Sequence, residues 1–327
     1  MTKRRILSGM RPTGALHLGN LHGALQRWIN LQEDYDCFFF VADWHALTSD
    51  YETPGGLSEY TREMVIDWLA AGLSPDKSTL FIQSHVKEHA ELFLILSMIT
   101  PLSWLERNPT YKDQMTQISG KDIATFGFLG YPVLQAADII MYKTHVVPVG
   151  EDQVPHVEIT REIARRFNHL YGEVFPEPQS MLTETARILG LDRRKMSKSY
   201  DNAIFMADSP EKTAERAAQM ITDPQRARKS DPGDPDVCNV YTFHRLYTDA
   251  DTVAEINEGC RTAALGCVEC KKKLAGSLNQ GLAPLREKRA YYAQRPGQVD
   301  EILKAGTDKA RQAAIDTMVE VRAAVKL

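Results

Sequence analysis

A short segment with the sequence KMSKS concentrates charge and hydroxyl groups in five residues: Lys195, Met196, Ser197, Lys198 and Ser199. A lysine is a compact and mobile positive charge, so two lysines three residues apart can converge on a single polyphosphate. The two serines add hydrogen-bonding groups to the same loop. The segment therefore indicates phosphate chemistry, and an exposed basic loop is the alternative when it is considered alone.

A second polar stretch, RPTGALHLGN, lies near the N-terminus at residues 11–20. It follows a short β-like run and precedes a helical pattern over residues 21–31. Its glycines allow a sharp turn and close approach to a ligand. A glycine-rich turn from strand to helix points free N–H groups and the positive helix end at anions. The stretch matches neither a P-loop nor the G-x-G-x-x-G fingerprint.

Four of the five cysteines lie close together in the C-terminal third: Cys238, Cys260, Cys267 and Cys270, spaced C-x21-C-x6-C-x2-C. In a reducing compartment such a group indicates metal binding rather than disulfides. Four thiolates suit either Zn²⁺ or an iron–sulfur cluster. Structural zinc sites more often use two short knuckles, and only one is present here. The fifth, Cys37, lies in an apolar run and is expected to fill a strand.

The composition describes an ordinary globular chain of 327 residues, with 43% hydrophobic and 25% charged residues. The net charge of −4 excludes a generic polyanion-binding protein, so any contact with nucleic acid must use local basic patches. No apolar run approaches the roughly 18 residues of a membrane span, and no secretory signal is apparent. We expect no membrane contact and a cytoplasmic location.

Strand and helix patterns alternate over the first 170 residues, which predicts a doubly wound parallel sheet of the Rossmann type. Strands are expected at 5–8, 37–42, 79–83 and 145–149, with helices at 58–71, 88–99, 132–142 and 154–171. Ligands of such sheets bind outside the carboxyl ends of the strands. Beyond residue 205 the pattern is helical, so we predict a catalytic domain over residues 1–205 and a helical domain over residues 206–327.

The ordered pair of signatures, HLGN near the N-terminus and KMSKS about 175 residues later, resembles the class I aminoacyl-tRNA synthetases. Asn20 stands where the first signature usually has a histidine. The segment YPVLQAAD at 131–138 resembles the amino-acid-pocket helix of the tryptophan and tyrosine members. VPVGEDQ at 147–153 and HVEITRE at 156–162 resemble the bacterial tryptophanyl-tRNA synthetases. This similarity covers most of the chain and is firmest over residues 5–205.

The choice between tryptophan and tyrosine depends on two residues. A tyrosine site needs two partners for the phenol hydroxyl, namely the aspartate of the pocket helix and a tyrosine from the first strand. Leu7 occupies that strand position, and an apolar wall there suits an indole. Asp138 would then accept the indole N–H, which is a donor-only group. Capping of a neighbouring backbone group is the alternative role for Asp138.

The resemblance implies that L-tryptophan and ATP form tryptophanyl-adenylate and pyrophosphate, and that tryptophan is then transferred to the 3′ end of tRNA(Trp). Charge on the phosphates would be stabilised by Mg²⁺ and four residues: Lys195, Lys198, Lys112 and Arg11. Implied ATP-binding residues are Arg11, Pro12, Thr13, His17, Gly19, Asn20, Gly150, Glu151, Asp152, Ile188, Lys195, Met196, Ser197, Lys198 and Ser199. Implied tryptophan-binding residues are Leu7, Gly9, His45, Tyr131, Gln135, Asp138, Val147, Val149 and Gln153.

The resemblance also favours a [4Fe–4S] cluster over zinc at the four cysteines, a homodimer, and anticodon binding by the helical tail. Basic patches at 271–273 and 286–289 could hold the tRNA, with a solvated helix face as the alternative. His17 could instead be a surface histidine, and His45 a core histidine. Two other functions keep the fold: a regulatory nucleic-acid-binding paralogue, and a nucleotidylyltransferase without an indole pocket.

Overall fold

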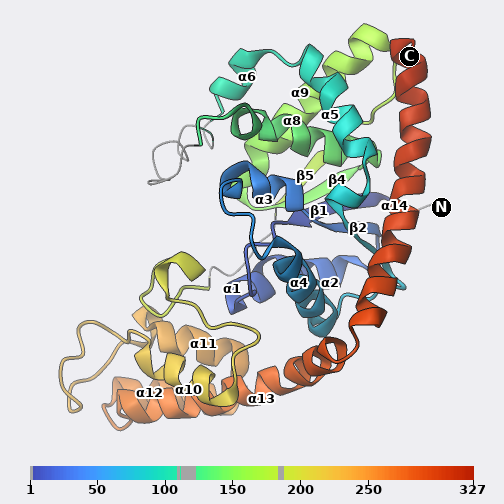
Figure 1. The fold of residues 1–327 in the computed structure, drawn as a ribbon. Helices are drawn as coiled ribbons and strands as arrows, with labels where there is room; N and C mark the ends of the chain where they lie inside the picture. The colour runs from blue at the N-terminus through green and yellow to red at the C-terminus, as the bar shows by residue number, and fades with distance from the viewer. Residues whose placement is uncertain (1–2, 109–110, 112–122, 183–187) are drawn as a thin grey trace.

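The computed structural model describes residues 3–108, 111, 123–182 and 188–327. Its centre is a five-stranded parallel sheet in the order β3-β2-β1-β4-β5 (Figure 1). The strands are β1 (Arg5–Met10), β2 (Asp36–Val41), β3 (Ser78–Ile82), β4 (Val146–Val149) and β5 (Gln179–Leu182). The predicted doubly wound parallel sheet is confirmed, because the chain winds outward from β1 in both directions.

Alternate side chains of each strand point to opposite faces of the sheet, and each face has its own apolar core. Ile6, Phe39 and Leu80 belong to one core, whereas Leu7, Phe38 and Phe81 belong to the other. The first core is covered by α1 (Leu18–Asn20), α2 (Gln26–Leu31) and α4 (Leu57–Ala71). The second is covered by α5 (Glu88–Ile99), α8 (Phe126–Met141) and α9 (Val154–Tyr171).

Helices α5 and α9 have the bounds that the sequence predicts, and α4 ends at Gly72, whose φ of +118° suits a glycine C-cap. Helix α8 differs, since it begins six residues before Pro132. Thr125 caps it by accepting a hydrogen bond from the Phe128 N–H, so Pro132 lies in the helix interior rather than in its first turn. Strand β5 was not predicted, because its side chains are only partly buried or exposed.

Short elements join these: α3 (Asp43–Asp50), α6 (Leu102–Glu106), a π-helix (Leu21–Leu25) between α1 and α2, and 3₁₀ turns at Gln83–His85, Glu151–Gln153, Lys198–Tyr200 and Pro235–Val237. The C-terminal region is helical, as predicted: α10 (Pro210–Gln219), α11 (Asn239–Tyr247), α12 (Ala250–Arg261), α13 (Cys267–Ala293) and α14 (Pro296–Val325). Ser209 caps α10 by accepting from the Lys212 N–H.

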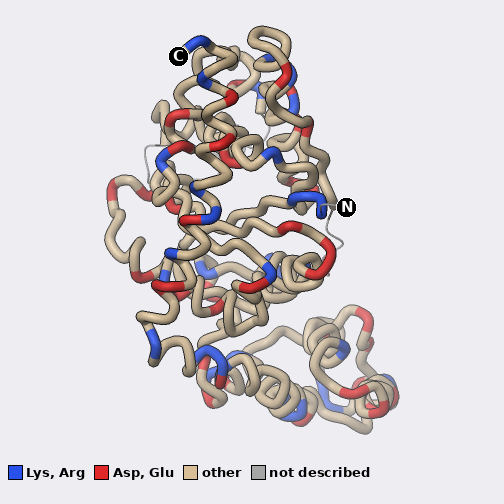
Figure 2. Tube along the Cα trace, turned by 90° about the vertical axis from the view of Figure 1, so that its right-hand side faces the viewer, with Lys and Arg blue, Asp and Glu red and all other residues tan. Residues whose placement is uncertain are grey.

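Helix α14 turns back from the helical region and runs along the sheet, with Ala310, Met318 and Val321 in the second core (Figure 1). Acidic and basic residues alternate along the whole trace, including the helical region (Figure 2). No helix among the described residues is long and apolar enough to cross a membrane. The division into domains at residue 205 stays a prediction.

Candidate active site

A cavity of about 540 Å³ opens at the carboxyl ends of β1 and β4, between those strands, the π-helix and α8. Many of the predicted site residues line it, although they are spread over the first 200 residues of the chain. They are Leu7, Gly9, Arg11, His45, Tyr131, Gln135, Asp138, Val147, Val149, Gly150, Asp152, Gln153 and Lys195. The sequence places these residues far apart, so the parallel sheet is what collects them at one edge.

The remaining predicted residues do not line this cavity: Pro12, Thr13, His17, Gly19, Asn20, Glu151, Ile188, Met196, Ser197, Lys198 and Ser199. Apart from Glu151 and Ile188, they belong to the two signature loops. Ile188 is buried in the first core, beside Met196. Lys112 lies outside the described residues.

Main-chain hydrogen bonds join the two signature loops. The Leu18 N–H donates to the Ile204 carbonyl at 2.9 Å, and the Met206 N–H donates to the Leu16 carbonyl at 2.9 Å. The buried Met196 side chain lies under the first loop, with its Sδ 3.4 Å from the Gly19 nitrogen. The segment after KMSKS therefore forms one unit with the glycine-rich turn.

Gly14 is required where the loops meet. Its φ of +117° is strained for any residue with a side chain, and a Cβ there would lie 2.5 Å from the Lys198 Nζ. The Lys198 ammonium thus occupies the space above the turn, and it also lies 5.2 Å from the centre of the Tyr60 ring. This contact places a KMSKS charge directly on the anion-binding turn.

His17 and Asn20 cap α1 reciprocally. The Asn20 N–H donates to His17 Nδ1, and the His17 N–H donates to Asn20 Oδ1 at 3.0 Å. Burial, together with the nearby Lys195 charge, lowers the pKa of His17 to about 4. The ring is therefore neutral at pH 7, and its proton must be on Nε2 because Nδ1 accepts. His17 can present an Nε2–H donor to a phosphate oxygen.

Asn202, just after KMSKS, is buried and holds this loop. Its Oδ1 accepts from the Ser197 N–H at 2.8 Å, while its Nδ2 donates to Asp192 Oδ1 at 2.7 Å and to the Lys195 carbonyl at 3.2 Å. The backbone of the loop is thus fixed, whereas the side chains of Lys195 and Lys198 are exposed. Neither lysine has an ion-pair partner among the described residues.

Asp138 lies at the cavity with no exposed surface, and both of its oxygens are hydrogen-bonded. Gln83 Nε2 lies 2.8 Å from each oxygen, His45 Nε2 lies 2.8 Å from Oδ2, and His89 Nδ1 lies 2.5 Å from Oδ1. Burial opposes the charged form, but the charge of His89 and hydrogen bonds from His45 and His89 hold the pKa of Asp138 below its usual value.

Because Asp138 is ionised it can only accept, so both histidines donate to it. His89 donates through Nδ1, and Tyr142 Oη then lies 2.6 Å from the other ring nitrogen, Nε2. Burial raises the pKa of Tyr142 well above its usual value, so its hydroxyl keeps its proton. Asp138 is therefore bound by side chains of three elements, and no backbone N–H of the described residues donates to it.

Strand β1 contributes Leu7, Ser8 and Gly9 to the cavity, and Leu7 gives it an apolar surface. Leu7 is buried and lines the cavity. A Cβ on Gly9 would lie 2.5–2.9 Å from atoms of the Phe40 ring, so only glycine leaves room for that aromatic side chain. An apolar, aromatic wall beside a buried carboxylate suits a flat apolar group with one hydrogen-bond donor.

Tyr131 and His156 form a second polar pair at the cavity. Asn108 Nδ2 lies 3.2 Å from His156 Nδ1, and Tyr131 Oη lies 3.0 Å from Nε2. Burial lowers the pKa of His156 to about 4, so its ring is neutral: Nδ1 accepts from Asn108 and Nε2 donates to Tyr131. The Tyr131 hydroxyl proton is then free to donate into the cavity.

Arg11 adds a charge at the cavity edge, where its Nη2 donates to Ser49 and lies 3.5 Å from Asp50 Oδ2. Burial lowers the pKa of Arg11, although the Asp50 carboxylate opposes this shift. Asp50 thus partly balances the arginine.

Sequence reasoning missed several residues that hold the site, among them Gln83, His89, Asn202, Arg27 and Thr48. Gln83 directly follows β3, and a polar residue at the carboxyl end of a buried strand is a signal that could have identified it. His89 lies within an apolar helix and carries no such signal.

The four cysteines come from three helix ends: Cys238 precedes α11, Cys260 lies in the last turn of α12, and Cys267 and Cys270 lie in the first turn of α13. Burial and then the other three thiols raise the pKa of Cys270 to about 12, so the four sulfurs are close enough to influence one another. Among the described residues, however, no three such side chains are placed to hold a single metal ion.

Some side chains of the two predicted basic patches bond within the protein. Arg289 on α13 donates to Asp67 and Glu63 on α4, and Arg286 donates to Thr213 on α10. Lys271 donates to the Ala218 carbonyl. These side chains tie α13 to its neighbours, whereas Lys272, Lys273 and Lys288 of the same patches are exposed, and a tRNA contact stays a prediction.

Comparison with known proteins agrees with this geometry. A family model described as tRNA synthetases class I (W and Y) matches residues 2–283. The chain is 52% identical to the tryptophan–tRNA ligase of Thermotoga maritima over 325 residues, covering 99% of both chains. It is 47% identical to that of Aquifex aeolicus, covering 99% of this chain and 100% of the relative.

Among solved structures, the tryptophanyl-tRNA synthetase of Campylobacter jejuni complexed with ADP and tryptophan matches with a TM-score of 0.92. The two chains are 35% identical, and the match covers 99% of this chain and 100% of the other. The chain belongs to the class I tRNA synthetases for tryptophan and tyrosine, and within them to the tryptophan–tRNA ligases.

Proposed function

We propose that this ligase activates L-tryptophan with ATP in the 540 Å³ cavity and transfers it to tRNA(Trp). The observation that carries the proposal is the buried, ionised Asp138 at a cavity that is also lined by the apolar Leu7 of β1. An indole offers a large apolar face and a single N–H donor, whereas a phenol hydroxyl both donates and accepts. With Leu7 in place of a second polar partner, the cavity favours the indole.

The reaction needs no covalent enzyme intermediate. The carboxylate of tryptophan attacks the α-phosphorus of ATP, and Mg-pyrophosphate leaves, so catalysis consists of positioning and charge stabilisation. Lys195 and Lys198 supply unpaired positive charge beside the glycine-rich turn, and His17 supplies a neutral N–H donor. Mg²⁺ arrives with the ATP, held chiefly by the phosphates. Lys112 and Arg11 stay proposed contributors.

The experiment that tests this function is exchange of labelled pyrophosphate into ATP, run with tryptophan and with tyrosine. Tryptophan should support exchange and tyrosine should support it at least ~10²-fold less, because a polar site rejects a ligand that leaves its groups unpaired. Equal exchange with both amino acids would overturn the assignment of substrate. Exchange with neither would favour a regulatory paralogue, and exchange independent of amino acid would favour a nucleotidylyltransferase.

We propose a [4Fe–4S] cluster on Cys238, Cys260, Cys267 and Cys270. The support is the placement of the four cysteines at the ends of α11, α12 and α13, where the Cys238, Cys260 and Cys267 thiols contribute to the raised pKa of Cys270. Structural zinc sites more often use two short cysteine knuckles, and Cys267 and Cys270 form the single one in this set. When bound, the cluster would hold the ends of α11, α12 and α13 together beside the proposed anticodon site.

Anaerobic purification tests the cluster. The protein should be brown, with broad visible absorbance and about four irons per chain. Colourless protein with one zinc per chain would overturn the iron assignment and leave the four-cysteine site intact. Protein lacking both metals would overturn the site itself.

A homodimer is also proposed, and an exposed apolar surface supports it. Met98 is 74% exposed, Phe126 68%, Leu102 60% and Leu94 55%, and these residues lie on the neighbouring elements α5, α6 and α8. Exposed apolar clusters of this kind mark interaction surfaces. The double variant M98E/L102E should halve the mass measured by light scattering, and unchanged mass would exclude this surface. A cytoplasmic location, where tRNA is charged, completes the proposal.

A further inference from the structure

Asp67 is a buried carboxylate that the proposed chemistry does not use. It lies on α4 with no exposed surface, inside the first apolar core, where an unpaired charge would be costly. Both oxygens are engaged: Oδ2 accepts from the Leu16 N–H at 3.3 Å, and Oδ1 accepts from Arg289 Nε at 2.8 Å. One carboxylate thus joins the glycine-rich turn to helix α13, 222 residues away.

Leu16 is held from both sides. Its N–H donates to Asp67, and its carbonyl accepts from the Met206 N–H at 2.9 Å, after the KMSKS loop. The next residue, His17, is the N-cap of α1 and has Nε2 left over from its capping bonds with Asn20. A displacement of the Leu16 peptide would therefore move His17 and the junction between the two signature loops together.

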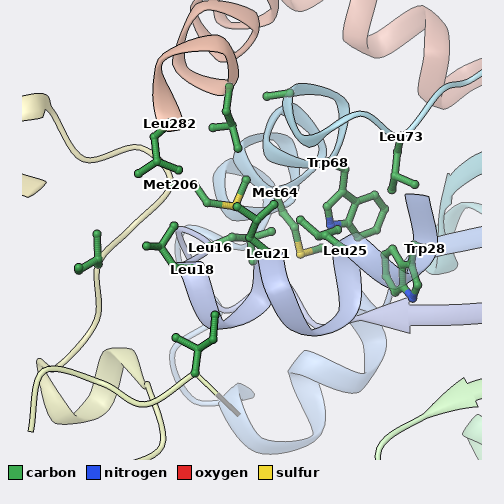
Figure 3. Packing of buried hydrophobic residues seen from close by; sticks show 14 of the residues in the cluster. Leu16, Leu18, Leu21, Leu25, Trp28, Met64, Trp68, Leu73, Met206 and Leu282 are labelled. Atoms are coloured by element: carbon green, nitrogen blue, oxygen red, sulfur yellow. The ribbon is translucent and has the colours of Figure 1, made fainter. Parts of the chain in front are cut away.

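The apolar side chains around the Leu16 peptide come from the same helices and loops as its hydrogen-bond partners. Figure 3 shows Leu16 and Leu18 of the turn beside Met64 of α4, Met206 after KMSKS and Leu282 of α13. Arg289 lies two turns beyond Leu282 on the same helix and also donates to Glu63 on α4. Helix α13 therefore reaches the turn through apolar packing at Leu282 and, indirectly, through the Arg289–Asp67 pair, while its other end carries Cys267 and Cys270.

We propose that Asp67 is a positioning residue for adenylate formation, which holds the Leu16 peptide so that His17 faces the phosphates. Arg289 on α13 completes the arrangement by donating to Asp67 on α4. Burial raises the pKa of Asp67 to about 6 even with Arg289 present, so removal of the arginine would favour the neutral carboxyl. The inference rests on the proposed function, since it assigns a role in that reaction.

The test measures single-turnover adenylate formation and tryptophan affinity for D67N, R289Q and the double variant D67N/R289Q. D67N places an amide against the guanidinium and should slow adenylate formation about 10-fold per active site, with tryptophan affinity within about 2-fold of wild type. R289Q should slow it by a similar factor. The double variant can form an amide pair in place of the ion pair, so it should recover part of the rate.

A structural role alone would not move these rates. R322A is the matched control, because Arg322 on α14 pairs with Glu91 on α5 in a comparable helix-to-helix ion pair away from the turn. R322A should lower Tm without slowing adenylate formation. If D67N and R289Q form adenylate as fast as R322A, the inference is wrong. If D67N does not fold, R289Q alone is compared with R322A, and equal rates of adenylate formation in these two variants would show that the inference is wrong. Failure of the wild type to form adenylate would instead contradict the proposed function.

Discussion

The two polar regions of the active site differ in whether their charged side chains have partners within the protein. In the amino-acid pocket, Asp138 is buried and already bonded to Gln83, His45 and His89. In the KMSKS loop, the backbone is fixed by Asn202, but Lys195 and Lys198 are exposed and lack ion-pair partners among the described residues. In the pocket the charged group is already hydrogen-bonded within the protein, whereas the lysines of the loop are left with unbalanced charge.

The difference assigns the two regions different tasks. A satisfied buried network is rigid, so it selects a ligand by shape and by one remaining hydrogen bond. Lysines without an ion-pair partner acquire one when the triphosphate binds. The stabilisation that they provide is largest when negative charge develops on the leaving pyrophosphate. The pocket should therefore control which amino acid binds, and the loop should control how fast it reacts.

The largest expected effect is in the loop. Lys195→Ala and Lys198→Ala should each lower the rate of adenylate formation about 10²–10³-fold, as for loss of one preorganised charge partner. Rapid-quench single-turnover assays measure this rate. Lys304→Ala, a change at an exposed lysine paired with Asp308 on α14, is the control and should leave the rate unchanged. A loss of only a few-fold in either loop variant would contradict the role of these charges.

Asp138→Asn should cost about 3 kcal/mol in kcat/KM for tryptophan, roughly 10²-fold, because a buried donor loses a charged acceptor. It should also lower Tm, since His45, His89 and Gln83 lose their shared partner. Glu173→Gln changes an exposed carboxylate that does not line the cavity and serves as the control. The unmutated enzyme should discriminate against 1-methyltryptophan, which lacks the N–H, and efficient activation of that analogue would exclude this role.

A smaller effect is expected for Asn202→Ala, which frees the KMSKS backbone without removing a lysine. Three hydrogen bonds to the loop and to Asp192 disappear, so the rate of adenylate formation should fall about 10-fold through poorer positioning. Asn257→Ala, which breaks a hydrogen bond to Tyr241 far from the loop, should not change the rate. An unchanged rate in Asn202→Ala would mean that the loop needs no fixed backbone.

The smallest expected effect is on the pH dependence of the unfolding free energy, and it comes from His156 beside the pocket. His156 has a folded pKa of about 4, against 6.5 for an unperturbed histidine. Between these values the unfolded chain binds more protons, so the contribution of His156 to the unfolding free energy is lost as pH falls from 6.5 to about 4. His156→Asn should therefore show a weaker dependence of unfolding free energy on pH in denaturant titrations. His169→Asn, at an exposed position, should keep the wild-type dependence.

Much of the fold and of the site could be predicted from the sequence, because the main residues of both lie in local sequence patterns. Alternating apolar strands and amphipathic helices predict the sheet, and the two signatures predict the loops that meet at Gly14 and Lys198. Leu7 and Asp138 were identified for the same reason, since each has a fixed place in such a pattern. Their assignment to tryptophan binding stays a prediction.

The partners of these residues could not be predicted in the same way. Gln83 and His89 come from a strand end and a helix that meet Asp138 only in the folded chain. Arg289 was predicted only as part of a basic patch, and the packing of α13 on α4 gives it Asp67 and Glu63 as partners. Long-range polar pairs depend on tertiary packing, and a single sequence carries no periodic signal for them.

The division of tasks between pocket and loop is tested most directly by measuring two quantities on the same two proteins. Tryptophan affinity and the single-turnover rate of adenylate formation are determined for Asp138→Asn and Lys198→Ala. We predict that Lys198→Ala keeps tryptophan affinity within about 2-fold and loses rate by at least about 10²-fold, whereas Asp138→Asn loses tryptophan affinity by at least about 10-fold. If Lys198→Ala weakened tryptophan binding as much as Asp138→Asn does, the account would be contradicted.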